Sequence, residues 1–72
     1  MNNYFVKIEK DENRCFYLSL KKRSTNSFVL LLLNSFKSAE IFSCPEDAKM
    51  RIALFCSYFS KYDHQDFEIV AF

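Results

Sequence analysis

Hydrophobic and polar residues alternate in two segments near the start of the chain, residues 4–8 and residues 14–21. The apolar positions are Tyr4, Val6 and Ile8 in the first segment and Phe16, Leu18 and Leu20 in the second. Successive side chains of a β-strand point to opposite faces, so this period predicts two strands that are each buried on one face. Asp11, Glu12 and Asn13 favour a turn between them, which predicts a hairpin.

The next apolar segment has no alternation. Residues 22–27 are polar and rich in Ser, Thr and Asn, which predicts a loop, and Phe28 to Leu33 are then continuously apolar. We interpret this run as a third strand that needs cover on both faces, although a helix on one side of a sheet covers only one of them. Residues 34–38 indicate a turn, and residues 39–42 a short extended segment.

A helix is predicted after this segment. Ser43-Cys44-Pro45-Glu46 fits a capping box, with Ser43 as N-cap and Glu46 returning a bond, and it predicts a helix over residues 45–62. Helical spacing places one apolar stripe toward the sheet, formed by Ala48, Ile52, Phe55, Phe59 and Tyr62, with Cys56 at its edge. A second apolar row on a different side of the helix consists of Met50, Leu54 and Tyr58. A monomer would leave this row in water.

Residues 67–72 are β-branched and aromatic, which predicts a final strand and the order β-β-β-α-β. The sequence therefore predicts a single α+β domain over residues 1–72, with an antiparallel sheet of three to four strands and one helix of the C-terminal half packed on one face. A right-handed crossover through the helix would place the last strand parallel to a neighbour, with the first strand as the expected one, but the sequence leaves the strand order open.

Composition narrows the classes of function. Half of the residues are hydrophobic, which is typical of a folded chain, and the net charge of +1 provides no overall field for binding nucleic acid or an anionic membrane. The N-terminal residues do not form a signal peptide, and the apolar run of residues 28–33 is too short to cross a bilayer. We therefore expect a cytoplasmic protein without a membrane partner.

Candidate chemistry is sparse. The chain has no glycine, which excludes the glycine-dependent phosphate loops, so we expect no cofactor. Cys44 stands where a helix N-terminus would activate a thiol, but a small structural residue explains this position as well. Cys44, Cys56 and His64 lack the number and spacing of ligands that a structural zinc site needs. Three cysteines without a C-x-x-C pair indicate reduced thiols, and we predict that the protein is not an enzyme.

The basic stretch Lys21-Lys22-Arg23 is an alternative candidate site. Together with Tyr17 it could contact phosphates and stack a base, which would make the chain a small nucleic-acid-binding module. Three charges of this kind are more often the solvated end of a hairpin, so nucleic acid is not the partner that we expect.

A resemblance points to a class of partner. The hairpin segment Phe16-Tyr17-Leu18-Ser19, the helix entry from Ala39 to Lys49 and the final Phe67-Glu68-Ile69-Val70 resemble a pattern in very short phage and prophage accessory proteins. The chain departs from this pattern at Cys44-Pro45 and in the run from Leu30 to Leu33. The resemblance implies no reaction and no functional residues. It implies an inhibitor or modulator that binds a host or defence protein in the cytoplasm of the host cell.

Surplus apolar surface is the main functional signal. Met50, Leu54 and Tyr58 on the helix, and one face of the third strand, are the predicted protein interface, because contiguous exposed apolar patches mark interaction sites. The leading hypothesis is a non-enzymatic interaction protein from a phage or another mobile element that occludes a partner, with a homodimer as a further use of the same surface.

Overall fold

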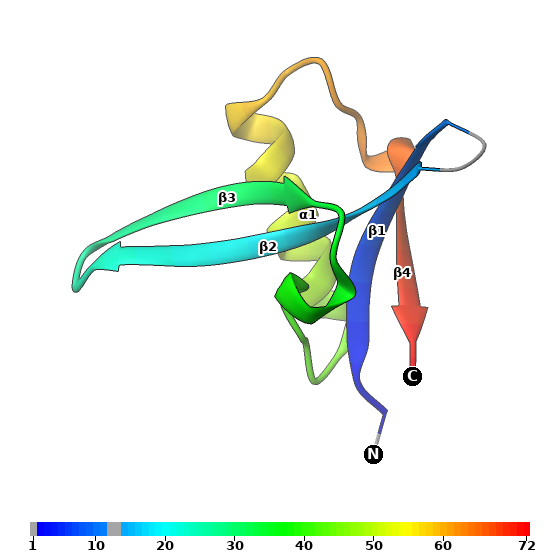
Figure 1. Cartoon of the computed structure of the whole chain (residues 1–72), viewed down its shortest axis with the longest axis horizontal. Helices are drawn as coiled ribbons and strands as arrows, with labels where there is room; N and C mark the ends of the chain where they lie inside the picture. The colour runs from blue at the N-terminus through cyan, green and yellow to red at the C-terminus, as the bar shows by residue number, and fades with distance from the viewer. Residues whose placement is uncertain (1, 12–13) are drawn as a thin grey trace.

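The computed structural model describes residues 2–11 and 14–72, and within them four strands form one antiparallel sheet in the order β3-β2-β1-β4 (Figure 1). The strands are β1 (Tyr4–Asp11), β2 (Arg14–Ser24), β3 (Ser27–Leu33) and β4 (Phe67–Ala71). Between β3 and β4 come the short helix η1 (Phe36–Ser38), the helix α1 (Pro45–Tyr58) and the short helix η2 (His64–Asp66). The predicted α+β class and the order of elements are confirmed. Asp11 belongs to β1, whereas Glu12 and Asn13 of the predicted turn lie outside the described residues.

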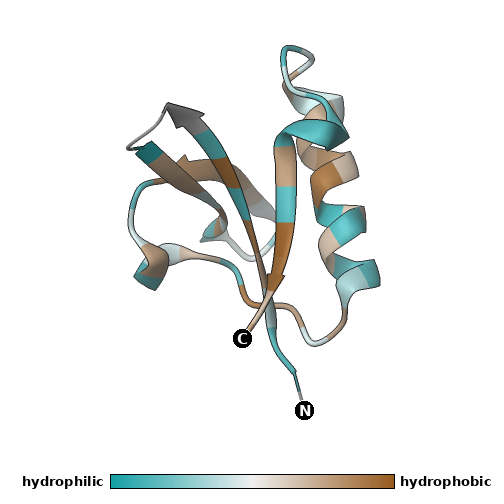
Figure 2. Ribbon diagram, turned by 90° about the vertical axis from the view of Figure 1, so that its right-hand side faces the viewer, coloured by the Kyte–Doolittle hydropathy of each residue, from teal (hydrophilic) through white to brown (hydrophobic). Residues whose placement is uncertain are grey.

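The hydrophobic core lies between α1 and one face of the sheet (Figure 2). Alternation along β1 and β2 directs Val6 and Leu18 into it, and both are completely buried. The helix contributes Ala48, Ile52 and Phe55, all of which are buried. The predicted strand faces and the main part of the predicted helix stripe are therefore confirmed.

β1 and β2 pair over only part of their length. Within the described residues these strands pair only from Lys7 and Tyr17 to Asp11 and Arg14, and on the other side of Lys7 and Tyr17 they diverge (Figure 1). The predicted extended segment fills the gap. The N–H of Glu40 donates to the carbonyl of Leu18 over 3.0 Å, and Phe42 and Tyr4 exchange backbone hydrogen bonds of 2.8 and 2.9 Å. This segment thus satisfies backbone groups that the divergence would leave unpaired.

The predicted loop over residues 22–27 is wrong. β2 extends to Ser24 and β3 begins at Ser27, so only Thr25 and Asn26 form the turn, and the register shifts between Lys22 and Ser24. This hairpin reaches beyond α1 (Figure 1). Its polar side chains therefore stay in solvent although the backbone is paired, and composition alone could not distinguish this arrangement from a loop.

Both ends of the helix differ from the prediction. Among the described residues, the N-cap is Cys44 rather than Ser43, and no side chain caps this end, so the predicted capping box with Glu46 does not form. The residue before a proline favours extended backbone, and Cys44 adopts it with φ −147° and ψ 153°. α1 ends at Tyr58 and not at residue 62 because Phe59 leaves the helical region with φ −125° and ψ 86°.

The final strand lies beside β1, as expected, but it runs antiparallel to it, which corrects the parallel arrangement of a simple crossover. Segment 34–44 carries the chain back along the sheet before α1 begins, so the helix runs in the direction of β1 and β4 returns (Figure 1). Lys7 lies opposite Glu68, and their side chains form an ion pair of 3.2 Å.

Candidate protein-interaction surface

A first groove lies between the C-terminal end of α1 and the part of the β2–β3 hairpin that extends beyond this helix. α1 packs mainly against β1 and β4, so it leaves part of the hairpin's near face uncovered. The groove has a volume of about 530 Å³ and is lined by residues 26–30 of the hairpin and by Tyr58 and Phe59 of the helix end. Phe28 and Phe59 are 45% and 41% exposed. Aromatic rings that stand in water around a concave surface are typical of a protein-binding site.

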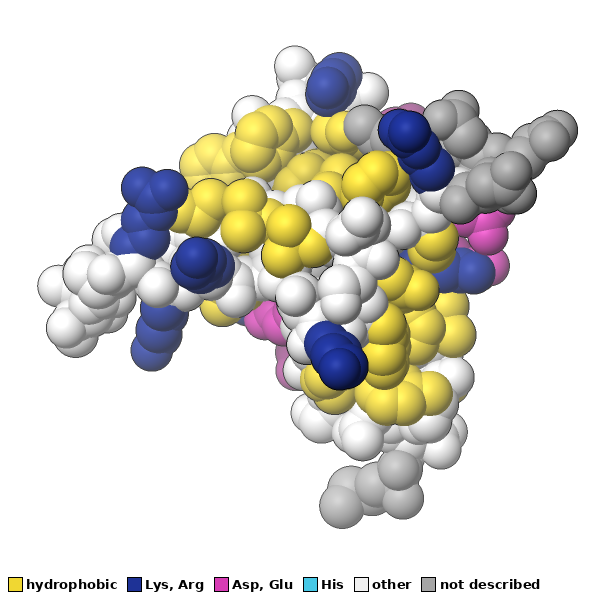
Figure 3. Space-filling model, in the orientation of Figure 1, with side chains coloured by type: hydrophobic (Ala, Val, Ile, Leu, Met, Phe, Trp, Pro, Cys, Tyr) yellow, Lys and Arg dark blue, Asp and Glu magenta, His cyan; other side chains and the backbone are white. Residues whose placement is uncertain are grey.

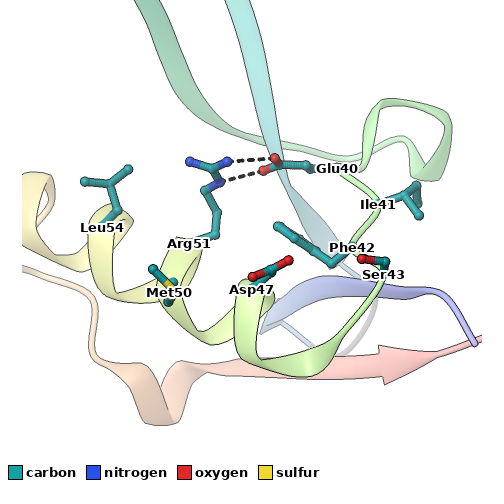
Figure 4. A pocket seen from close by; sticks show the side chains of 8 residues that line it. All are labelled: Glu40, Ile41, Phe42, Ser43, Asp47, Met50, Arg51 and Leu54. Atoms are coloured by element: carbon teal, nitrogen blue, oxygen red, sulfur yellow. Dashed lines mark hydrogen bonds and ion pairs between the residues drawn. The ribbon is translucent and has the colours of Figure 1, made fainter.

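A second groove lies at the other end of the helix, between α1 and segment 40–43 (Figure 4). Its volume is about 540 Å³, and Ile41, Met50 and Leu54 supply its apolar lining. The side chains of Arg51 and Glu40 point toward one another across this groove and form an ion pair of 2.8 Å (Figure 4). The groove therefore combines an apolar rim with a charged pair that is already satisfied within the chain.

The predicted helix row connects the two grooves. Met50 and Leu54 line the groove beside segment 40–43, and Tyr58 lines the groove beside the hairpin. Met50 is 70% and Tyr58 is 65% exposed, whereas Leu54 is half-buried and packs against the core. The structure thus leaves Met50 and Tyr58 in solvent, as the spacing predicts for a single chain, and covers Leu54 in part. Its role as an interface stays a prediction.

The face of the sheet opposite α1 is also rich in apolar side chains (Figure 3). Phe5, Tyr17, Phe36 and Phe72 form a cluster of aromatic rings there, with neighbouring centroids 4.9 to 5.7 Å apart. Phe36 of η1 stands at its centre and is 43% exposed. The hydrophobic pattern of the sequence did not predict this cluster. The available signal was that Phe5 and Tyr17 occupy positions where alternation would place polar residues.

The predicted nucleic-acid residues do not all lie on one face of the sheet, because Tyr17 and Lys21 share a face of β2 and Lys22 points to the other. Lys21 and Lys22 are exposed neighbours in β2, so their side chains point to opposite faces, and Arg23 lies at the register shift. Tyr17 contacts Phe5 at 5.7 Å within the aromatic cluster. It is four residues from Lys21, a separation of roughly 13 Å along a strand.

The cysteines are separate, half-buried free thiols within the described residues, at positions 15, 44 and 56. Burial raises the pKa of the Cys56 thiol, and the negative charge of Asp63 raises it further. His64 lies in η2, where its Nδ1 is 4.0 Å from a carboxylate oxygen of Asp63. In the ranges 2–11 and 14–72, no group of three or more His, Cys, Asp or Glu side chains is placed to hold a metal ion.

Comparison with protein-family models, with curated proteins and with solved structures found no significant match. Across the described part of the chain, no helix has both the length and the apolar content that are needed to cross a membrane. The surfaces of the chain itself are therefore the basis for assigning a function.

Proposed function

We propose that this protein is a non-enzymatic binding module that covers a surface of another protein through the row of Met50, Leu54 and Tyr58. The observation that supports the proposal is the exposure of Met50 and Tyr58 between two grooves on one side of α1. Removing apolar surface from water contributes roughly 25 cal/mol per Å², so a partner that covers these side chains gains binding energy from them.

The two grooves suit a partner with protruding apolar side chains. One such side chain would enter beside Met50 and Ile41, and a second would contact Tyr58 and Phe59 at the far end of the row. Arg51 and Glu40 are already paired, so covering them leaves neither of the two without a partner, and Asp47 at the same groove is exposed. This arrangement provides an apolar centre with a polar border, which is the usual composition of a protein interface.

The resemblance to short phage and prophage proteins favours a host or defence protein as the partner. Occlusion of that protein in the host cytoplasm would inhibit or modulate it without any reaction.

The test is a quantitative affinity purification from host lysate with the wild-type chain and with Met50→Glu, followed by reconstitution of the purified pair. Met50 is mostly exposed, so the substitution places a charge in the row without opening the core. We expect a specific partner whose affinity falls at least about tenfold with Met50→Glu, since burying an unpaired charge is costly.

Lys49→Glu is the matched control. Lys49 is exposed on α1, and helical spacing places it about 140° around the helix from Leu54, the middle of the row. The proposal predicts that this variant retains the partner at wild-type affinity. Equal loss with both substitutions, or undiminished binding by Met50→Glu, would contradict the assignment of the row.

A further inference from the structure

β3 is an edge strand of the described sheet and carries no charge and no proline. Its sequence is Ser-Phe-Val-Leu-Leu-Leu-Leu, and the sheet order gives it β2 as a neighbour on one side only. Proteins usually protect such an edge with charged side chains, proline or a covering segment, because unpaired backbone groups attract another strand. A long, apolar and unprotected edge therefore indicates that another strand pairs with it.

Backbone hydrogen bonds determine which residues of β3 direct their N–H and C=O groups outward. The carbonyl of Leu18 accepts a hydrogen bond from Glu40 on the β1 side of β2, so Tyr17 and Ser19 direct their backbone groups toward β3. Tyr17 pairs with Leu33 and Ser19 pairs with Leu31. The backbone N–H and C=O groups of the alternate residues therefore point to the free edge. These outward residues are Phe28, Leu30 and Leu32.

We propose that a second copy of this chain pairs with β3 in antiparallel fashion, with Leu30 on the two-fold axis. In this register Leu30 lies opposite the partner's Leu30, and Phe28 lies opposite the partner's Leu32. Every outward residue then meets an outward residue, which allows about six backbone hydrogen bonds between the strands. The free edge is thus complementary to itself over the whole length of β3, and this is the reason to expect a second copy rather than an unrelated strand.

The charges of the neighbouring strand are compatible with this pairing. β3 itself brings no like charges together, because it has none. Lys21 pairs with Val29 and Lys22 pairs with Phe28 in the hairpin, so the two copies of each lysine lie three strand spacings apart and at different levels of the sheet. The copies of Lys21 are the closer pair, at roughly 16 Å, which is about twice the screening length at physiological salt.

The surface area that the dimer would bury is also sufficient for a specific interface. Phe28, Tyr58 and Phe59 around the hairpin groove are 45%, 65% and 41% exposed. With roughly 200 Å² for an aromatic side chain, they offer about 300 Å² per protomer and about 600 Å² in a dimer. The partner's Leu32 would enter this groove beside Phe28. The paired edges, about 23 Å long, add the remainder of the roughly 1,000 to 1,200 Å² at which specific interfaces begin.

The other edge of the sheet, formed by β4, favours a closed dimer over an open filament. β4 spans Phe67–Ala71 and contains Glu68, so it is shorter than β3 and carries a charge. Pairing of β3 with β4 of the next molecule would place Glu68 opposite a leucine and would extend into a filament. Pairing of β3 with the partner's β3 occupies the apolar edge of each copy, so the assembly stops at a dimer. It covers Tyr58 and Phe59 but leaves Met50, Leu54 and the groove beside segment 40–43 open. The dimer and a foreign partner therefore compete for the hairpin groove alone, and this inference does not rest on the proposed function.

The test exploits the register. In the proposed dimer, Val29 lies opposite the partner's Leu31 on the face away from α1. A double variant with Val29→Lys and Leu31→Lys therefore places like charges opposite each other at two positions. Val29→Lys with Leu31→Glu places opposite charges there instead. By light scattering over a dilution series, we expect twice the chain mass of 8.6 kDa for the wild type and for the Lys/Glu variant, and a folded monomer for the Lys/Lys variant.

Amide hydrogen exchange of the wild type gives a second measurement that does not depend on the variants. The amides of Phe28, Leu30 and Leu32 are expected to become at least about tenfold more protected as concentration rises through the dimerisation range. A monomer at every concentration, a dimer in which these amides stay unprotected, or a Lys/Lys variant that remains a dimer would overturn the inference. Binding of a foreign protein to the Met50 row is measured separately, so failure of the dimer is distinguishable from failure of the proposed function.

Discussion

The guanidinium of Arg51 donates two hydrogen bonds to the carboxylate of Glu40, from Nε to Oε1 over 2.8 Å and from Nη2 to Oε2 over 3.0 Å. This contact joins α1 to the segment that separates β1 from β2. The helix therefore holds that segment in place, and with it one wall of the groove beside Met50.

Replacing Arg51 tests this contact. Arg51→Lys keeps the charge but removes the fork of donors, and we expect a loss of about 1 kcal/mol of unfolding free energy. Urea denaturation of the two proteins measures the difference. Lys49→Ala, an exposed substitution on the same helix, is the control and should change stability by less than about 0.5 kcal/mol. The contact has no structural importance if the two variants lose the same stability.

Two apolar residues of α1 should differ sharply in their effect on stability. Ile52 is 3% exposed and Met50 is 70% exposed. Ile52→Ala opens a cavity and should cost about 2–5 kcal/mol, whereas Met50→Ala should stay within about 0.5 kcal/mol. A chain of this size has only about 3–5 kcal/mol of net stability, so Ile52→Ala should unfold a large fraction of the protein. Thermal unfolding followed by circular dichroism measures both, and similar losses would contradict the described core.

Cys56 should react slowly with alkylating reagents. Burial raises the pKa of its thiol, so less thiolate is present near pH 8 than for a free cysteine, and the thiolate is the reactive form. We expect the alkylation rate to keep rising above pH 9 and to reach the rate of free cysteine in denaturant. Mass spectrometry of the alkylated peptides provides the measurement. A fast reaction at pH 7 would mean that Cys56 is not in the described environment.

We expect no binding to nucleic acid, because Lys21 and Lys22 point to opposite faces and Tyr17 packs within the aromatic cluster. Fluorescence anisotropy with short single-stranded DNA and RNA at low salt measures this. Binding that weakens steeply with salt, and that is lost when Lys21, Lys22 and Arg23 are replaced by alanine, would revive the alternative function.

The sequence was sufficient wherever burial on one face determines the pattern. Val6 and Leu18 belong to sets of apolar residues that recur at every second position, and the stripe from Ala48 to Phe55 follows the helical period, so the elements that form the core were predictable. The second row was predictable for the same reason. Met50 and Tyr58 fall outside the stripe, and one sheet cannot cover both sides of a helix.

Other features depend on tertiary context. The sequence could not predict that Lys22 lies in a strand, because both faces of the hairpin accept polar side chains where it extends beyond α1. The direction of β4 depends on the path of segment 34–44, which has no regular period. The cluster around Phe36 depends on η1 folding over the sheet, and that contact joins residues far apart in the chain. The edge of β3 became apparent only once the strand order was known.

The pairing of β1 with β4 also constrains the order in which the protein folds. Asn3 and Phe72 exchange backbone hydrogen bonds of 3.2 and 2.9 Å, so these contacts join residues at opposite ends of the sequence. The hairpin of β2 and β3 closes locally and should form within about 1–10 μs, whereas the pairing of β1 with β4 must wait for a much larger loop to close. During synthesis, β1 therefore lacks its final neighbour until residues 67–71 have left the ribosome, and the nascent chain is most vulnerable to misassembly in that interval.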